Sequence, residues 1–198
     1  MRIGVDIDGV LNRRQEFILE YGSKYCLETG RGYLKDPNAL HFGDMYGWTK
    51  PERDDFWDHY GWLQMYALPA QLCASEVIKK LKADGHEIWI ITGRNNGDRR
   101  VLEMPEHETW DVVTRRWLQN NEIYFDEFGF NHQNKGQFCR DNQIDVMIED
   151  DPGYLETFDE QTKVFIFNQP YNRDATTPNC ERVFGWYNIY NKIRELEK

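Results

Sequence analysis

The sequence predicts an α/β fold, in which helices cover both faces of a parallel β-sheet. Short apolar segments, such as residues 3–5, 88–91 and 146–148, are continuous runs rather than alternating ones. Such runs are typical of strands that are buried on both faces. Segments with helical spacing separate these runs along the chain, which favours alternating strands and helices. The length of 198 residues fits one such domain with a sizeable insertion.

The first strand and the first helix follow directly from these patterns. Residues 3–5 are apolar and partly β-branched, and they run into acidic residues and Gly9, which indicates a buried strand that ends in a loop. Residues 14–28 place Phe17, Ile18 and Tyr21 near helical spacing. Gly30 lies just beyond this segment and predicts the end of the helix.

The next segment, up to about residue 69, differs in composition. It is dense in aromatic residues with charges interleaved, and it contains no alternating strand pattern. Pro51 followed by Glu52 is typical of a helix start. We therefore expect a small, mostly helical insertion whose aromatic face packs against another part of the molecule.

The remaining elements alternate in the same way. Residues 74–84 form a helix with Val77, Ile78 and Leu81 on one face, and Gly85 ends it. The later strands are expected at 87–92, 123–125, 128–130, 144–148 and 164–167, and the later helices at 108–120, 136–142 and 183–197, with a loop at 168–179. The predicted fold is Rossmann-like with three layers, a core domain at 1–12 and 70–198, and a helical cap at 13–69.

The bulk composition limits the partners of the chain. Lys and Arg number 24 against 34 Asp and Glu, so the net charge is −10. A surface of this charge repels the backbone of duplex nucleic acid, which excludes extended duplex binding. A small anionic partner then needs a local positive pocket or a metal.

The cysteines and the N-terminus point to a reduced, soluble protein. The four cysteines form no CxxC pair, which predicts free thiols rather than a structural zinc site. No apolar stretch approaches the length of a membrane span, and the N-terminal run is too short for a signal-peptide core. We expect a cytoplasmic protein that does not enter a membrane. Its oligomeric state does not follow from the sequence.

Acidic residues follow two of the predicted strands. Asp6 and Asp8 follow the first strand, and Glu149, Asp150 and Asp151 follow the strand at 144–148. In open α/β sheets, ligands bind beyond the carboxyl ends of the strands, so these groups are expected at one edge. Such a cluster needs a bound cation or shifted pKa values. Hard oxygen ligands without His or Cys favour Mg²⁺.

A phosphate site is predicted at the same edge. Thr92, Gly93 and Arg94 follow the second long strand, and Lys135 opens the helix before the acidic strand. The Thr92 hydroxyl suits a hydrogen bond to a phosphate oxygen, and Lys135 suits a compact positive charge beside the same group. With Mg²⁺, these residues indicate phosphoryl chemistry.

The spacing of the two aspartates suits a two-step reaction. One carboxylate would attack phosphorus and form an aspartyl phosphate. The other would protonate the leaving oxygen and then deprotonate the incoming water. Because one group cannot do both at once, a pair separated by one residue fits this chemistry.

Four segments, in order, resemble the four motifs of the haloacid dehalogenase (HAD) superfamily of phosphatases. They are residues 6–11 (Asp-Ile-Asp-Gly-Val-Leu), residues 91–94 (Ile-Thr-Gly-Arg), Lys135, and residues 148–151 (Ile-Glu-Asp-Asp). The first is the most specific, and the lone lysine gains weight only from its place before the acidic motif. The resemblance covers roughly residues 1–12 and 70–167 and implies a HAD-like fold.

The resemblance also implies a role for each matching residue. Asp6 would be the nucleophile and a Mg²⁺ ligand. Asp8 would be the general acid and base, with its backbone carbonyl on the metal. Thr92 and Lys135 would hold the phosphoryl group. Asp150 would be the side-chain metal ligand. Glu149 would either support that ligand without touching the metal or bind the metal as well.

The chain is further similar to bacterial and phage 5'-nucleotidases of the deoxyribonucleotidase type, which implies hydrolysis of a (deoxy)nucleoside monophosphate. Residues 12–15 (Asn-Arg-Arg-Gln) depart from the pattern of that branch. Two alternatives keep the scaffold, namely a sugar-phosphate phosphatase and a phosphotransferase. A third is a regulatory module that binds phosphate or metal without catalysis, and protein phosphatase activity is disfavoured by the cap.

Several residues have simpler interpretations. Trp57 and Tyr60, at helical spacing, are expected in the core of the cap rather than against a base. Asp151 fits a helix cap as well as a metal ligand. Arg13 or Arg14 either lies on the surface or reaches the distal group of the substrate. Surface or hydrogen-bonded roles are expected for the paired arginines 99 and 100 and for the five scattered histidines.

Overall fold

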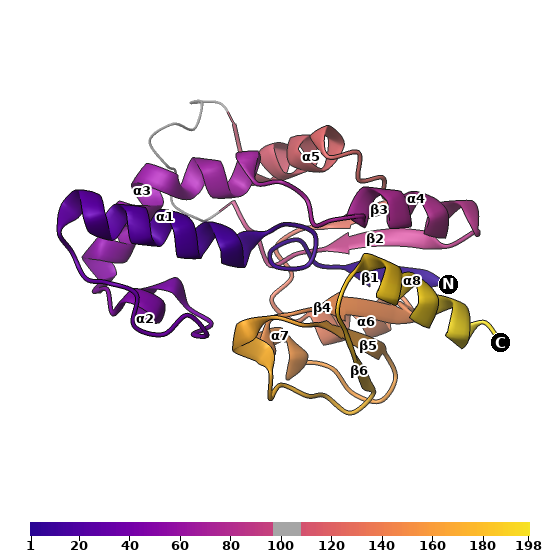
Figure 1. The fold of residues 1–198 in the computed structure, drawn as a ribbon. Helices are drawn as coiled ribbons and strands as arrows, with labels where there is room; N and C mark the ends of the chain where they lie inside the picture. Colours follow the sequence, from indigo (N-terminus) through magenta and orange to yellow (C-terminus); the bar gives the residue numbers. More distant parts are fainter. Residues whose placement is uncertain (97–107) are drawn as a thin grey trace.

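The sheet consists of six parallel strands with the N-terminal strand near its centre (Figure 1). The computed structural model describes residues 1–96 and 108–198. The strands are β1 (Arg2–Val5), β2 (Glu87–Ile91), β3 (Glu127–Gly129), β4 (Val146–Glu149), β5 (Lys163–Phe167) and β6 (Cys180–Val183), in the spatial order β3-β2-β1-β4-β5-β6. Ile3 of β1 pairs with Ile88 of β2 on one side and with Val146 of β4 on the other. The predicted α/β class with a parallel sheet is confirmed.

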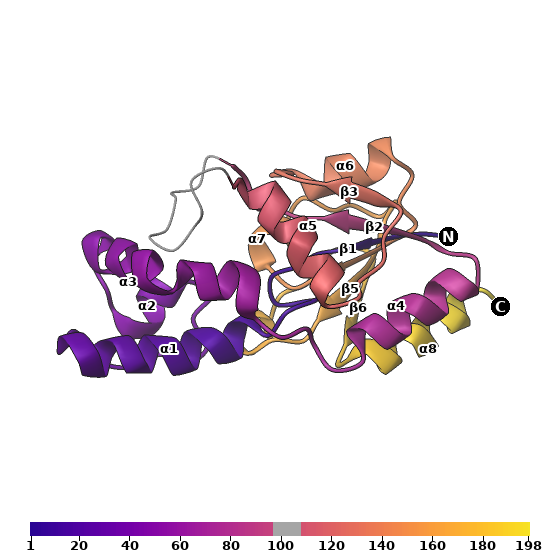
Figure 2. The same cartoon turned by 90° about the horizontal axis from the view of Figure 1, so that it is seen from above.

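Helices cover both faces of this sheet and complete the three layers (Figure 2). The helices of the core are α4 (Ala74–Ala83), α5 (Trp110–Asn120), α6 (Lys135–Asp141), α7 (Pro152–Leu155) and α8 (Trp186–Leu196). Successive strand residues point to opposite faces. Ile90 accordingly packs in the cluster that contains α4, α5 and α8, and Ile91 packs in the cluster that contains α6 and α7. Both faces are therefore apolar, which explains why the strand sequences do not alternate.

A helical segment lies outside the sheet, between β1 and β2, and is called the cap below. It consists of α1 (Arg14–Thr29), α2 (Phe42–Tyr46), α3 (Lys50–Trp62) and the π-helical turn η1 (Leu63–Ala67). The chain enters and leaves it side by side, because Asn12 and Ala70 form an antiparallel bridge. A capping box of Thr49 and Glu52, with Pro51 in the first turn, begins α3.

The aromatic residues of the cap mostly pack on one another. Tyr46 and Trp48 stack with ring centroids 4.5 Å apart, and Tyr25 meets Phe56 edge-on at 5.7 Å. These side chains are buried, so the cap has a hydrophobic cluster of its own, separate from the two clusters of the sheet.

Two local predictions are wrong. Residues 123–125 are not a strand, because the Ile123 amide donates to the carbonyl of Leu118 and completes the turn after α5. Residues 180–183 form the edge strand β6, which the sequence analysis did not assign. Only Val183 of this strand is buried, so it lacks the apolar run by which the other strands were found.

Some expectations lie outside the described residues, namely those for Arg99, Arg100 and His107. Among the residues that the structure describes, no helix has both the length and the apolar character needed to cross a bilayer.

Close packing beside α6 gives a first testable prediction. A Cβ on Gly136 would lie 1.8 Å from the carbonyl oxygen of Thr157 and 2.4 Å from its carbonyl carbon. Because both contacts are with backbone, relief requires α6 or the turn after α7 to move. We expect Gly136→Ala to destabilise the protein by about 3 kcal/mol, measured by urea unfolding. Gly185→Ala is the control, since nothing lies within 4 Å of its Cβ position; equal losses in both variants would contradict the argument.

Candidate active site

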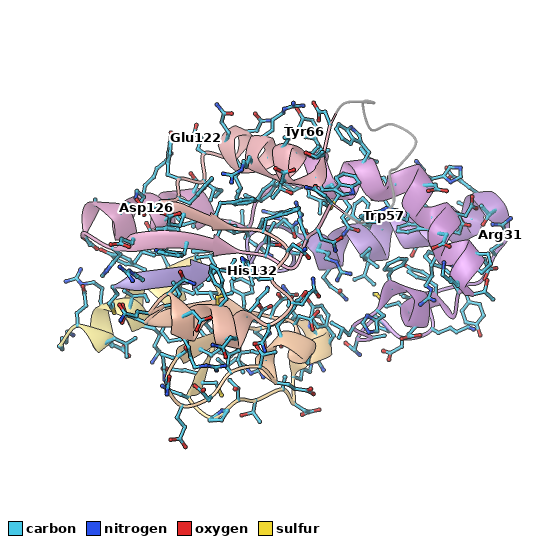
Figure 3. The ribbon with its side chains drawn as sticks, turned by 180° about the vertical axis from the view of Figure 1, so that it is seen from behind. Arg31, Trp57, Tyr66, Glu122, Asp126 and His132 are labelled. Atoms are coloured by element: carbon cyan, nitrogen blue, oxygen red, sulfur yellow. The ribbon has the colours of Figure 1, made fainter. Side chains whose placement is uncertain are left out.

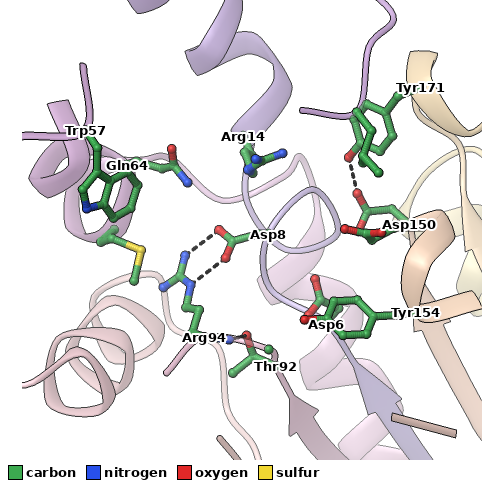
Figure 4. A pocket seen from close by; sticks show the side chains of 14 residues that line it. Asp6, Asp8, Arg14, Trp57, Gln64, Thr92, Arg94, Asp150, Tyr154 and Tyr171 are labelled. Atoms are coloured by element: carbon green, nitrogen blue, oxygen red, sulfur yellow. Dashed lines mark hydrogen bonds and ion pairs between the residues drawn. The ribbon is translucent and has the colours of Figure 1, made fainter. Parts of the chain in front are cut away.

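A cavity of about 250 Å³ lies where the carboxyl ends of the central strands face the cap (Figure 4). This is the position at which open α/β sheets bind ligands. Its walls come from the loops after β1, β2, β4 and β5 and from the cap. The lining residues are Asp6, Asp8, Arg14, Leu40, Trp57, Gln64, Met65, Thr92, Gly93, Arg94, Asp150, Asp151, Tyr154 and Tyr171.

The loop after β1 carries the two aspartates and turns sharply at Gly9. The Asp6 amide donates to the carbonyl of Ile148 (3.1 Å), which ties the loop to β4. Gly9 has φ +92°, and a Cβ there would lie 2.1 Å from Asp150 Oδ2. Only glycine meets both conditions. The Gly9 that follows Asp8 in the sequence therefore lets the Asp6 loop approach Asp150 closely.

Lys135 joins two of the acidic groups in the interior. Its Nζ donates to Asp6 Oδ1 and to Glu149 Oε2, both at 2.6 Å. The side chains of Lys135 and Glu149 are fully buried. The Lys135 ammonium also lies 4.1 Å from the ring centroid of Tyr154, within the range of a cation–π contact. Although burial lowers the pKa of Lys135, Asp6 and Glu149 raise it further, so the net shift is upward and the group is a fixed positive charge.

Asp6, Glu149 and Asp150 form a cluster with more negative charge than Lys135 balances. One ligand oxygen from each lies within 4.8 Å of the others. Burial raises the pKa of Asp6 to about 7, helped by Glu149 and opposed by Lys135. Burial and the charge of Glu149 likewise raise the pKa of Asp150 well above its ordinary value.

Asp150 has one oxygen with no hydrogen-bond partner. Its Oδ2 accepts a hydrogen bond from Tyr171, whereas its buried Oδ1 has no partner among the described residues. Buried acceptors are nearly always paired in native proteins. An unpaired carboxylate oxygen beside other carboxylates fits a divalent cation that prefers oxygen ligands.

The other two residues of the acidic motif are engaged differently. Glu149 Oε1 accepts from the amides of Asp150 and Asp151, both at 3.0 Å, while its Oε2 accepts from Lys135. Both of its oxygens are thus occupied. The Asp151 side chain accepts from the Gly153 amide and caps α7, whereas Asp150 has a buried oxygen without a partner among the described residues.

Arg94 clamps Asp8 by a bidentate ion pair (Figure 4). Its Nε donates to Asp8 Oδ2 at 2.7 Å and its Nη2 to Asp8 Oδ1 at 2.6 Å. Nη1 reaches Thr114 Oγ1 at 3.2 Å. Burial would raise the pKa of Asp8, but the Arg94 guanidinium outweighs it and lowers the pKa to about 2. Arg94 was expected to contact phosphate, and in this structure its guanidinium is instead directed to Asp8.

Thr92 and Gly93 lie at the end of β2, as their sequence position predicts. The Thr92 amide donates to the carbonyl of Gly129 (2.9 Å), and its Oγ1 accepts from the Arg94 amide (3.2 Å). The hydroxyl hydrogen of Thr92 remains available to a ligand in the cavity. A Cβ on Gly93 would lie 1.9 Å from the hydroxyl of Tyr154, so this position has to remain small.

Sequence reasoning missed several residues of the cavity or placed them elsewhere. Tyr171 follows β5 and Tyr154 lies in α7, and a search beyond the ends of all the strands would have found Tyr171. Trp57 was expected in the core of the cap, but it lines the cavity and packs edge-on against Trp110 at 6.2 Å. Tyr60 is in the core of the cap, as expected. Gln64 lies in η1, and no sequence pattern predicted this π-helical turn. Arg14 lines the cavity, one of the two alternatives considered for it.

Figure 3 shows the molecule from behind, with Glu122, Asp126 and His132 among the labelled residues. Glu122 and Asp126 there bind Lys79 and Lys82 of α4. His132 packs on Phe138 with ring centroids 3.9 Å apart. It makes an aromatic contact and is not part of the acidic cluster of Asp6, Glu149 and Asp150.

Two bacterial proteins resemble the chain over nearly its whole length. Each is provisionally named a nucleotidase, one from Bacillus cereus and one from Oceanobacillus iheyensis. Both are 24% identical over 205 residues, covering 98% of this chain and 99% and 100% of the relatives. No protein-family model matches the chain.

Solved structures share the fold at lower identity. A predicted phosphatase from Clostridium acetobutylicum aligns with a TM-score of 0.62 at 16% identity, covering 98% of both chains. A HAD family hydrolase from Deinococcus radiodurans, crystallised with bound phosphate and sodium, aligns with a TM-score of 0.63 at 14% identity, covering 99% of this chain and 96% of the other. The expected resemblance to HAD-superfamily proteins is confirmed at the level of the fold.

Proposed function

From this resemblance and from the geometry of the cavity, we propose that the chain is a HAD-type phosphatase that hydrolyses small phosphate monoesters with Mg²⁺. The single observation that carries the proposal is the convergence of Asp6, Lys135 and Asp150 beside Thr92 at the sheet edge. A carboxylate that would act as the nucleophile, a fixed cation and an acidic cluster that would bind a metal thus surround one small space. Its members come from segments far apart in the sequence, so it does not arise from local structure.

The residues around Asp150 fit the metal that the proposal requires. The unpaired Oδ1 of Asp150 and the carboxylate of Asp6 would hold Mg²⁺, with the backbone carbonyl of Asp8 as a further ligand. When bound, Mg²⁺ would offset the charge of the phosphoryl oxygens. Glu149 would keep Lys135 in place rather than bind the metal directly.

In the first half of the reaction, Asp6 is the nucleophile. Its carboxylate oxygen forms a bond to phosphorus while the bond from phosphorus to the ester oxygen breaks. Asp8, when protonated, donates a proton to that leaving oxygen. Thr92 and Lys135 hold the phosphoryl oxygens, so that most of the rate comes from positioning and charge.

In the second half, Asp8 acts as the base. Its carboxylate takes a proton from a water molecule, whose oxygen bonds to phosphorus as the bond to Asp6 breaks. The products are inorganic phosphate and a free Asp6 carboxylate, with Asp8 protonated again. The clamp by Arg94 keeps Asp8 ionised, which suits this base step, and Asp8 has to leave the clamp before it can act as an acid.

A (deoxy)nucleoside monophosphate is the proposed substrate. Both relatives are named as nucleotidases, and the cap contributes Trp57 and Gln64 to the wall of the cavity. An indole ring and an amide are suited to stacking on a base and to hydrogen bonding with its edge. Phosphate release from a panel of nucleotides and sugar phosphates, with and without Mg²⁺, tests both the activity and the substrate class. Equal turnover of sugar phosphates would favour the alternative substrates.

Metal binding gives a second testable prediction. Mg²⁺ at about one hundred times its Kd should stabilise the wild type by about 2.7 kcal/mol, measured as a rise in Tm. Since burial raises the pKa values of Asp6 and Asp150, protons compete with the metal, and the rise should be larger at pH 8 than at pH 6. Asp150→Asn should abolish the rise. Asp151→Asn should keep it, because asparagine also caps helices; the reverse result would make Asp151 the ligand.

A further inference from the structure

The cap contains a second cavity that continues the first. It has a volume of about 450 Å³ and is lined by Arg14, His41, Phe42, Gly43, Lys50, Arg53, Asp54 and Trp57. Arg14 and Trp57 line both cavities, so the two are neighbours on either side of these side chains. The first cavity alone is small for a whole metabolite, as ligand sites span roughly 300–1,000 Å³.

The second cavity is rich in cations on a strongly acidic protein. Of the residues that the structure describes, two arginines, a lysine and one histidine line it, against a single acidic residue, Asp54. Lys50 donates to Asp54 at 2.7 Å. The net charge of the chain is −10, so a positive lining here is contrary to the overall composition and would attract an anion.

Two of these cations lack a hydrogen-bonded partner among the described residues, although Arg14 lies near enough to Asp8 to help lower the pKa of that carboxyl. The Arg14 and Arg53 side chains make no hydrogen bond or ion pair with any residue that the structure describes. By contrast, Arg13 pairs with Glu16, Arg31 with Asp55, and Arg94 with Asp8. Arginine forks bind phosphate and carboxylate oxygens in a bidentate way. Figure 4 shows Arg14 on the cap side of the first cavity, between Gln64 and Tyr171.

Gly43 makes room for Arg53 at the cavity wall. A Cβ on Gly43 would lie 2.2 Å from Cδ and 3.0 Å from Cγ of Arg53. Gly43 is buried and is not among the glycines with positive φ, so its backbone does not require glycine. The small residue instead lets the Arg53 stem lie across α2.

We propose that the second cavity binds a second phosphate of the substrate, so that the preferred substrate is a bisphosphorylated small molecule, with Arg53 and Arg14 on the distal phosphate. This inference rests on the proposed phosphatase function and narrows its substrate class. The reacting phosphate lies by Asp6, the carbon skeleton passes Trp57, and the distal phosphate reaches Arg53. A nucleoside bisphosphate has this layout. A phosphorylated carboxylic acid offers the arginines a similar but weaker anion.

Steady-state phosphate release tests the proposal directly. A nucleoside 5'-monophosphate is compared with the 3',5'-bisphosphate of the same nucleoside, and ribose 5-phosphate with ribose 1,5-bisphosphate, all with Mg²⁺. A hydrogen-bonded charge pair is worth about 1.5–3 kcal/mol, so kcat/KM for the bisphosphate should be roughly tenfold to a hundredfold higher, mainly through KM. A phosphorylated carboxylic acid should fall between the two.

Substitutions of Arg53 test whether this residue causes the preference for the bisphosphate. Arg53→Gln should reduce the preference for the bisphosphate by about tenfold, and Arg53→Lys should keep part of it. Lys80→Gln is the control, because Lys80 lies in α4 away from both cavities. Unchanged circular dichroism and Tm in Arg53→Gln would show that the packing against Gly43 survives.

A binding measurement separates this proposal from the proposed function. Titration calorimetry of Asp6→Asn protein with Mg²⁺ should show tighter binding of the bisphosphate than of the monophosphate, and Arg53→Gln in the same background should remove the difference. If neither kcat/KM nor affinity favours bisphosphates, or if Arg53→Gln leaves the preference intact, the second-phosphate site is refuted while the phosphatase stands. If no monoester is hydrolysed but the Arg53-dependent binding persists, the proposed function fails and the site remains.

Discussion

Asp6→Asn should lower kcat for phosphate release by at least about 10⁴-fold, because the reaction loses its nucleophile. The amide has the same shape as the carboxylate and can still accept from Lys135, which keeps its bond to Glu149. The fold should therefore remain. The measurement is single-turnover and steady-state phosphate release with Mg²⁺, accompanied by a thermal melt.

Two further variants make this result interpretable. Asp174→Asn, at an exposed position on the same protein, should leave kcat unchanged. Asp8→Asn should accumulate a phosphoenzyme that survives an acid quench and is cleaved by hydroxylamine, when the substrate is an aryl phosphate whose leaving group needs no proton. Asp6→Asn should form none. Phosphoenzyme in the Asp6 variant would exclude Asp6 as the nucleophile.

Lys135→Met should destabilise the protein by about 3–5 kcal/mol, because removing one partner of a buried ion pair leaves the other charges uncompensated. Asp6 and Glu149 would both lose their contact at 2.6 Å with the ammonium. Since Lys135 lowers the pKa of Asp6, which is about 7 in its presence, the variant should hold Asp6 protonated to higher pH. Activity should fall with stability, and the remaining activity should rise with pH.

The control for Lys135 is Lys163→Met. Lys163 is partly exposed and pairs with Glu181 only at 3.8 Å, so its loss should cost less than about 1 kcal/mol. Urea unfolding in EDTA measures both variants. Mg²⁺ should restore part of the loss in the Lys135 variant, because a second cation then lies among the same carboxylates. Equal losses in the two variants would show that the buried charges of the site do not depend on Lys135.

Much of the core fold could be predicted because its strands are buried on both faces. A strand that is buried on both faces needs consecutive apolar residues, and β1, β2, β4 and β5 each contain such a run. The edge strand β6 has one buried residue and therefore no such run. In β3, Glu127 is exposed and Phe128 half-buried, so the pattern located a strand near residue 128 but not its limits.

The position of Asp6, Thr92 and Asp150 at one edge of the sheet was predictable, because each follows a strand and parallel strands bring their carboxyl ends together. The interactions between the loops that follow these strands were not predictable. The pairing of Arg94 with Asp8 joins residues 86 positions apart, and nothing local distinguishes it from a contact with phosphate. The placement of Trp57 depends on how α3 meets α5, since a helical face can point toward its own domain or toward a neighbour. Periodicity alone does not decide between these.

The central place of β1 in the sheet has a consequence for the order in which the chain is made. This strand and Asp6 are translated before both hydrogen-bonding neighbours, since β2 begins at residue 87 and β4 at residue 146. The intervening cap has its own cluster of aromatic residues, so it can pack before β1 has paired with β2 and β4. Pairings that span such separations form slowly. The strand β1 is therefore made early but completes its pairing late, and the candidate site stays incomplete until Asp150 and Tyr171 have emerged.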